Sequence, residues 1–218
     1  VASGAKGFGV AGAASVLTSA RTVDAGLLNI QSGDLGDVSV VARDAANAVL
    51  IAGAVAGAGK AGVGGAAAFA DISHDVDAYV EALGSASESL VIGRLSVQAL
   101  SDTLIISLAG SAGIGTGPKG VGLAGTAAVN LIDNSTQARV VDSFLAKGSD
   151  ALAPTPKVEI NAEDNSSVWT LAGAVGVGGT AGFGAGVSVN SLSNETLALI
   201  SGGAIANAGA VSVVAANT

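Results

Sequence analysis

The sequence predicts an all-β fold, an elongated structure made of repeated units, on three observations. A short strand-like pattern recurs along the chain, apolar residues alternate with polar ones, and glycine interrupts the longer apolar runs. Alternation with a period of two is typical of a strand that buries one face. Each interior glycine costs a helix about 1 kcal/mol, so the glycine-rich runs are not predicted to be helical.

The recurring unit is the strongest of these signals. Similar strand-like segments begin at residues 38, 95, 158 and 211, and each of the first three is followed by an apolar run, a glycine-rich stretch, an Asx-rich segment and a further strand. Repeats of this kind bury a core by stacking on one another. We therefore expect one continuous array: a partial repeat at 1–37, units at 38–94, 95–157 and 158–210, and the start of a further unit at 211–218.

Alternation within the units supports strands. Val38, Val40 and Ala42 alternate with Ser39 and Arg43, and β-branched residues suit a half-buried pleated surface.

Residues 151–157 contain two of the three prolines of the chain, and we expect them to form a surface loop. Neither terminus has a signal peptide or a change of pattern, so we expect the array to continue beyond both ends.

Two architectures can use this unit. In a β-solenoid (a parallel β-helix-like fold), which we favour, a turn typically takes ~20 residues. Each unit would then make three turns, and the fragment would be a rod roughly 50 Å long. In the alternative, stacked long β-hairpins or layered sheets, the apolar run pairs with the run after the turn at 59–62, 117–120 or 179–182.

Charge and composition argue against nucleic-acid binding and predict a closely packed interior. The net charge is −8 and no basic stripe is present, so nucleic acid is not an expected partner. Aromatic residues make up only 3% of the chain while glycine contributes 33 residues. The layers must therefore pack closely over small side chains, because large side chains are too few for an ordinary core.

The glycines also form a pattern that imitates a nucleotide-binding motif. Residues 7–12, 57–62 and 120–125 each spell G-x-G-x-x-G. A dinucleotide site needs this motif once, between a strand and a helix, whereas here it occurs in three successive repeats, so we expect no cofactor. We assign the glycines of the Gly-apolar-Gly cores a structural role; they are Gly62, Gly64, Gly120, Gly122, Gly182 and Gly184.

The Asx-rich segments offer the polar candidates. Asp71, Asp75 and Asp77 surround the single histidine, His74, and their carboxylates are possible calcium ligands. We favour a solvated polar turn there and predict no metal site. In the equivalent segments asparagine predominates, and it can cap turns or stack into hydrogen-bonded ladders. We expect this structural role for Asn130, Asn134, Asn190 and Asn194.

Catalysis is not predicted. The carboxylate pairs Asp75/Asp77 and Glu163/Asp164 could be proposed for glycoside hydrolysis, but few aromatic residues are present to line a sugar groove. A nucleophilic serine needs an activating base, and one histidine in an acidic segment is poor support. We therefore predict that the chain is not an enzyme and name no catalytic residue.

Residues 172–190, followed by N-x-T-x-A at 194–198, resemble the repeats of very large bacterial surface proteins of the leukotoxin and filamentous-haemagglutinin adhesin types. Residues 134–138 match the same closing motif. The resemblance implies a secreted, extracellular or cell-surface protein and a structural or adhesive segment that forms a rod or fibre. Self-association into a larger array is the expected partnership, with the host ligand unidentified.

Two alternative functions remain open. The Gly/Ala-rich hairpins could act as membrane strands of a pore-forming toxin, but membrane strands carry aromatic girdles at both interfaces, which this sequence lacks, so membrane insertion is not expected. A glycan-binding β-solenoid is the further alternative.

Overall fold

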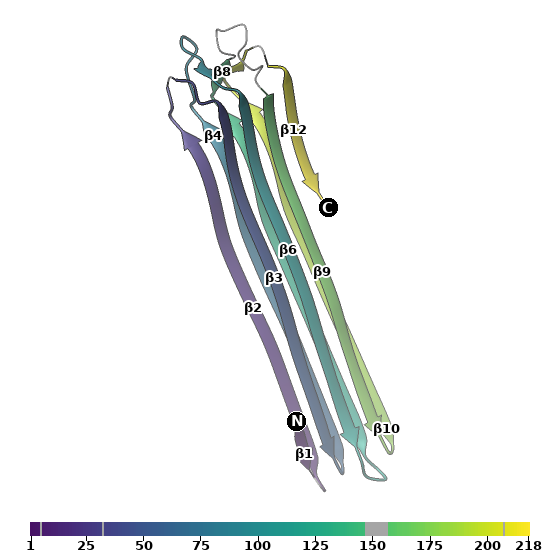
Figure 1. The fold of residues 1–218 in the computed structure, drawn as a ribbon. Helices are drawn as coiled ribbons and strands as arrows, with labels where there is room; N and C mark the ends of the chain where they lie inside the picture. Colours follow the sequence, from purple (N-terminus) through teal and green to yellow (C-terminus); the bar gives the residue numbers. More distant parts are fainter. Residues whose placement is uncertain (5, 32, 147–156, 207) are drawn as a thin grey trace.

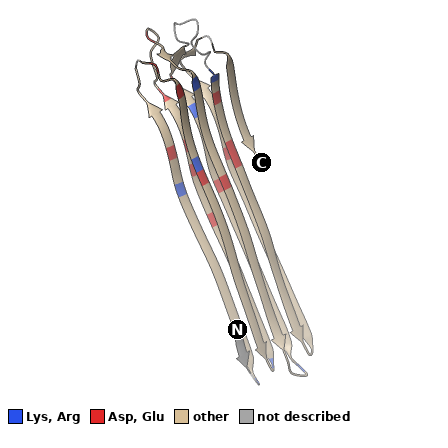
Figure 2. Cartoon of the chain, in the orientation of Figure 1, with Lys and Arg blue, Asp and Glu red and all other residues tan. Residues whose placement is uncertain are grey.

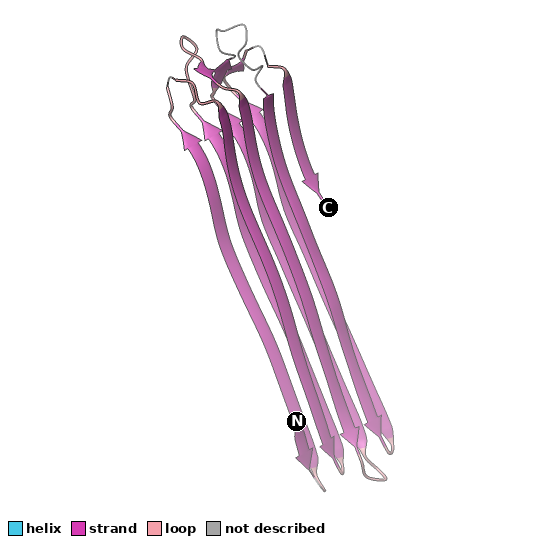
Figure 3. Cartoon of the chain, in the orientation of Figure 1, coloured by secondary structure: helices cyan, strands magenta, loops and turns pink. Residues whose placement is uncertain are grey.

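The computed structural model describes residues 1–4, 6–31, 33–146, 157–206 and 208–218, and most of them lie in strands (Figures 1 and 3). No helix occurs among these residues, so none of them forms a helix able to cross a membrane. The strands are β1 (Ala2–Gly4), β2 (Phe8–Leu28), β3 (Asp37–Ala58), β4 (Ala61–Glu81), β5 (Leu90–Val91), β6 (Arg94–Gly115), β7 (Val121–Val141), β8 (Phe144–Ala146), β9 (Lys157–Gly178), β10 (Ala181–Ser201), β11 (Ala204–Ile205) and β12 (Ala210–Asn217).

These strands form three parallel sheets. Sheet A has the order β1-β3-β6-β9-β12, sheet B the order β10-β7-β4-β2, and the short sheet C the order β11-β8-β5. Sheets A and B are long and lie face to face, while sheet C lies at one end of the long strands (Figure 1). The fold is therefore all-β, elongated and solenoid-like, as the sequence predicts.

The predicted length of the solenoid turn is wrong. Each unit makes one turn, not three: the second unit, for example, contributes β6 to sheet A, β7 to sheet B and β8 to sheet C. A strand of 22 residues extends over about 70 Å, whereas one turn adds only ~4.8 Å along the stacking axis. The molecule is a flat blade whose long dimension follows the strands, rather than a rod of roughly 50 Å along the stacking axis.

The hairpin pairing of the alternative architecture is also wrong, although the layered sheets named with it are present. β3 and β4 are joined by a tight turn, but β3 pairs in parallel with β6 and β4 pairs in parallel with β2 and β7. The two arms of each turn thus belong to different sheets and meet through their side chains. The turns themselves lie at 59–60, 116–120 and 179–180, next to the glycines that the sequence indicated.

Register is kept residue for residue between units. Val38 pairs with Leu95, Leu95 with Val158, and Val158 with Val211. Because the side chains of a strand alternate between its faces, this register gives equivalent residues of every unit the same face. The interior is consequently a set of columns, each built from one residue per turn.

The interior columns form two apolar clusters. The first lies near sheet C and contains large residues, among them Leu90, Leu95 and Ile160. The second lies further along the long strands and consists largely of alanine, with Leu50 and Ile72 among its larger members. The core therefore becomes thinner away from sheet C, as expected for a chain with few large side chains.

The six glycines assigned a structural role lie where the long sheets approach each other at the turn end of the blade. A Cβ atom at Gly64 or Gly184 would lie less than 3.0 Å from backbone atoms of the opposite sheet, at Ala112 and Ala174 respectively. The same holds at Gly62, Gly122 and Gly182 for the facing strand, and at Gly120 for Gly115 across the turn. Only glycine fits there, because the facing backbones leave no volume for a side chain.

The Asx-rich segments lie within long strands. Residues 71–75 belong to β4, 130–134 to β7 and 190–194 to β10. The predicted polar turn around His74 is therefore wrong, because the strand continues through it to Glu81. Of the predicted surface loop at 151–157, residues 151–156 lie outside the described residues, and Lys157 begins β9.

Charge divides the blade into two halves. The segments 7–20, 45–59, 61–70, 103–118, 120–132 and 165–194 contain no Asp, Glu, Lys or Arg. They form the strands of the half of the blade nearer the turns, which we call the uncharged half; the charged side chains at that end are Lys6, Lys60 and Lys119, which lie outside the strands. The charged side chains of the long strands gather toward sheet C (Figure 2).

Candidate functional site

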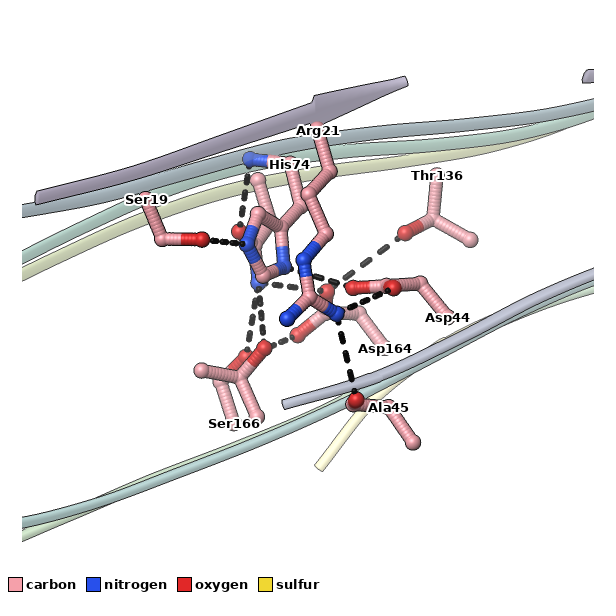
Figure 4. A network of polar contacts seen from close by, with 10 residues as sticks. Ser19, Arg21, Asp44, Ala45, His74, Thr136, Asp164 and Ser166 are labelled. Carbon is pink, nitrogen blue, oxygen red and sulfur yellow. Dashed lines mark hydrogen bonds and ion pairs between the residues drawn. The ribbon is translucent and has the colours of Figure 1, made fainter. Parts of the chain in front are cut away.

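A layer of polar side chains crosses the interior between the two apolar clusters (Figure 4). In sheet B its central column is Arg21, His74, Asn134 and Asn194, one residue from each of β2, β4, β7 and β10. In sheet A the facing column is Asp44, Ser101, Asp164 and Asn217. Five of these eight side chains are buried (Asp44, His74, Ser101, Asn134 and Asp164), whereas Arg21 and Asn217 are exposed. Buried polar groups are generally hydrogen-bonded, but the Ser101 hydroxyl has no partner among the described residues.

Asp164 is the centre of this layer. Its side chain is fully buried, yet Ser166 Oγ donates to its Oδ1 at 2.6 Å and Asn194 Nδ2 donates to the same oxygen at 2.7 Å. Thr136 Oγ1 and Asn134 Nδ2 both donate to Oδ2 at 3.4 Å. Four donors from three different strands thus compensate the desolvation of one carboxylate.

Asn134 links neighbouring turns. Its Oδ1 accepts a hydrogen bond from the backbone N–H of His74 at 3.3 Å, and its Nδ2 donates to Thr103 Oγ1 at 3.2 Å. Asn134 and Asn194 are register partners, and both donate to Asp164. The structure therefore brings these two predicted residues together, although the ladder passes through a carboxylate rather than directly between the amides.

A second polar column lies in the uncharged half. Asn130 Nδ2 donates to Asn190 Oδ1 at 2.8 Å, and Thr170 Oγ1 from the facing sheet donates to the same oxygen at 2.8 Å. Asn130 is fully buried. These two asparagines make a direct amide-to-amide bond between adjacent turns, which is the ladder geometry.

His74 occupies the column position that asparagine holds in the next two turns. Its side chain is fully buried, with Nε2 3.1 Å from Ser19 Oγ and Nδ1 2.6 Å from Asp44 Oδ2. Arg21 Nη1 donates to Asp44 Oδ1 at 3.1 Å. Neither His74 Nδ1 nor Asp44 Oδ2 has an aligned hydrogen-bond partner, so the two atoms are in close contact without good hydrogen-bond geometry.

Burial lowers the pKa of His74 below its ordinary value of 6.5. The Asp44 carboxylate opposes this effect and raises the pKa, while the Arg21 guanidinium lowers it further. Desolvation prevails, so the imidazole is neutral at pH 7. In that form one ring nitrogen can accept a hydrogen bond from the Ser19 hydroxyl.

The chain of contacts Ser19–His74–Asp44 has the connectivity of a nucleophile, a base and an orienting carboxylate. All three side chains point into the space between the sheets. The equivalent interior positions of other turns hold Asn134 and Asn194 in place of His74, and Ser101 and Asp164 in place of Asp44. The arrangement is therefore one version of a hydrogen-bonding layer that every turn carries.

The three calcium candidates lie on the opposite face of β4 from His74. Asp71, Asp75 and Asp77 point outward, and Asp71 and Asp75 are four positions apart along the strand, about 13 Å at ~3.3 Å per residue. Asp77 forms an ion pair with Arg139 of β7. In the described part of the chain, no three acidic, histidine or cysteine side chains are grouped as metal ligands would be.

Of the two carboxylate pairs considered for glycoside hydrolysis, one is divided between the two faces of its strand and the other is engaged by an arginine. Glu163 is exposed on the outer face of sheet A, whereas Asp164 is buried between the sheets. Asp75 and Asp77 share the outer face of sheet B, where Asp77 is engaged by Arg139. Strand parity thus keeps Glu163 and Asp164 from acting on one substrate.

The outer face of sheet B carries a shallow groove of about 740 Å³ in the uncharged half. It runs across the strands and is lined by small residues, including Gly65, Ala67, Gly125 and Ala127. Its walls and floor are almost entirely apolar. The groove offers contact area for an apolar surface but no polar group positioned for catalysis.

No family model, curated protein or solved structure matches the chain. The class of protein therefore follows from the fold itself, a parallel β-solenoid-like repeat protein.

Sequence reasoning missed Asp44, Asp164 and Arg21 as members of the interior layer. The sequence did contain a sign that the first two point inward. Asp44 lies an even number of residues after the apolar positions Val38, Val40 and Ala42, and Asp164 lies an even number after Val158, so each shares a strand face with them. The glycine-rich motifs at 57–62 and 120–125 lie at turns or within strands of sheets A and B, with no helix after them.

Proposed function

We propose that the chain is a structural segment of an extended extracellular protein, in which solenoid turns stack into a broad blade on a bacterial surface. Residues 172–190 and 194–198, which resemble adhesin repeats, support the extracellular location. The role is mechanical and adhesive rather than catalytic.

One observation carries this proposal: the unbroken parallel register of the long strands. Every residue of β6 has a partner in β3 and another in β9, over all 22 positions. Each turn therefore offers the next turn the same hydrogen-bonding edge that it pairs with itself on its other side. Turns can consequently be added along the axis indefinitely. The interior polar layer fixes this register, because a slip would leave buried donors unpaired.

The proposal is tested by duplicating residues 95–157 and measuring the shape of the product by small-angle X-ray scattering. We expect the long dimension to stay near 70 Å and the axial dimension to increase by ~4.8 Å. Circular dichroism reports whether the added unit folds as strand. A duplicated unit that stays unstructured, or that lengthens the 70 Å dimension, contradicts axial stacking.

Acyl transfer by Ser19 is the second candidate, favoured by the contacts Ser19–His74–Asp44. It is the weaker one, because His74 has no exposed surface and its contact with Asp44 is not an aligned hydrogen bond. A fluorophosphonate probe distinguishes the two functions. We expect no labelling, and labelling that disappears in Ser19→Ala would favour the enzyme.

A further inference from the structure

The outer faces of the uncharged half expose large apolar side chains in ordered columns. On sheet A the column Ile51, Leu108 and Leu171 forms a ridge across β3, β6 and β9. Ile51 is 68% exposed and Leu171 66%. Trp169, on the next outward column, is 70% exposed. Exposed apolar residues that occur singly need no explanation, but a contiguous patch marks an interaction surface.

The opposite outer face, on sheet B, has the complementary shape. The groove of about 740 Å³ runs along the columns of Gly65 and Gly125 and of Ala67 and Ala127. Columns of larger residues flank it, with Leu123 on one side and Phe69 on the other. Ridge and groove both run across parallel strands ~4.8 Å apart, so successive side chains of a ridge meet successive strands of a groove at the same spacing.

Parallel sheets are generally covered on both faces, and here each long sheet is covered on one face only. Fifteen outward residues, five columns on three strands, project over roughly 500 Å² of sheet. Two partners each contribute such an area, and projecting side chains add to it, so the total accessible area buried is on the order of 1,200 Å². This is the lower end for a specific interface. The absence of charge removes the desolvation cost that ion pairs would add.

A lipid bilayer fits these faces less well. The long sheets are open at their edge strands, and unpaired backbone groups at a sheet edge cost several kcal/mol each in hydrocarbon. A second copy of the chain imposes no such cost, because stacking face to face leaves the edges in water.

We propose that the occupant of these faces is a second copy of this chain, with the sheet A ridge of one copy seated in the sheet B groove of the next. This lateral contact goes beyond the axial stacking proposed above and does not depend on it. Because the two surfaces are different, the contact is heterologous, and successive copies form an open stack of blades.

The test measures the mass of the 218-residue chain by light scattering from about 1 to 500 μM, a range set by the modest interface. We expect the mean mass to rise with concentration. Ile51→Lys places a charge on the ridge and Gly125→Gln fills the groove, where a side chain would meet open space; each variant alone should remain monomeric. Val41→Lys and Ser135→Gln are matched controls, since both are outward positions on the same strands outside the uncharged half, and should associate normally.

Mixing the two variants decides the geometry. Ile51→Lys keeps an intact groove and Gly125→Gln keeps an intact ridge, so an equimolar mixture should form dimers and stop there. Circular dichroism establishes that each variant is folded. A wild-type chain that stays monomeric at 500 μM, or a mixture that stays monomeric, overturns the proposal. Co-sedimentation with phosphatidylcholine vesicles that Ile51→Lys abolishes would assign the ridge to membrane and likewise overturn it.

Discussion

At the scale of single residues, the interior layer depends on complete pairing around Asp164. The carboxylate is fully buried and accepts hydrogen bonds from Ser166, Asn194, Asn134 and Thr136. A buried carboxylate without such donors would be strongly destabilising. With them, it fixes the relative position of three strands at one point.

Replacing Asp164 by alanine is expected to lower the free energy of unfolding by about 2–4 kcal/mol, because several buried donors lose their acceptor. Urea denaturation followed by circular dichroism measures the change. Glu163→Ala is the control, since the neighbouring carboxylate is exposed on the same strand. A similar loss in both variants would show that the buried network adds nothing.

His74 gives the fold a pH dependence. Its pKa is lowered in the folded state by burial, whereas the unfolded chain has a pKa near 6.5. At pH values between the folded-state and the unfolded-state pKa, the unfolded chain binds more protons than the folded one. The contribution of His74 to the free energy of unfolding is therefore complete above about pH 6.5 and is lost as the pH falls through the folded-state pKa. Because the chain has one histidine, an NMR titration of its ring reports that pKa directly.

The replacement His74→Asn is expected to remove this component of the pH dependence, which lies below about pH 6.5. Asparagine continues the column of Asn134 and Asn194, so the fold should be retained. Urea denaturation at several pH values compares the two proteins. An unchanged slope of stability against pH would mean that His74 is not the group responsible.

At the scale of elements, the face of the strand on which a glycine lies decides whether that position could accept a side chain. Gly64 points inward against the backbone of Ala112, while its neighbour Gly65 points outward into open space. The two residues belong to the same strand and the same repeat core, yet only the inward position excludes a side chain. The thin end of the blade thus depends on the inward glycines.

The paired variants Gly64→Ala and Gly65→Ala test this difference. We expect Gly64→Ala to cost about 2 kcal/mol or more through overpacking, and Gly65→Ala to be neutral or to stabilise by up to about 1 kcal/mol. Thermal and urea unfolding measure both changes. Equal effects in the two variants would contradict the close approach of the sheets.

At the scale of the whole molecule, the stacking of turns depends on each unit keeping the same residue register as its neighbours. Val49 is followed on β3 by Leu50, whose register partner on β6 is Ser107. Joining Val49 to Ser107 therefore makes a hybrid strand in which every side chain keeps its face. A one-residue error at the same junction reverses all faces beyond it.

Deleting residues 50–106 should therefore leave a shorter blade that unfolds cooperatively, whereas deleting 50–105 should leave the second half of the hybrid strand with polar and apolar faces exchanged. Far-UV circular dichroism and limited proteolysis compare the two deletions. If both fold equally well, residue-for-residue register is not what joins the turns.

The all-β class, the repeat and its stacking into an array followed from the sequence, because alternation and glycine content are local properties that strands obey wherever they pair. The length of the solenoid turn did not follow. Alternation in β3 and β4 is the same whether the two strands bond to each other or to strands a unit away, so only non-local pairing decided between a hairpin and a broad turn.

The candidate site divides in the same way. Asn130, Asn134, Asn190 and Asn194 were visible as a recurring polar pattern in the sequence. Their partners were not, because Asp164 reaches Asn134 and Asn194 only where two sheets face each other. The sequence by itself determined which residues are equivalent between units and which face of a strand each one occupies, because the repeat and the alternation show both. The tertiary structure alone decided that equivalent residues lie on adjacent strands and which columns meet, because that depends on the length of the turn and on how the long sheets pack.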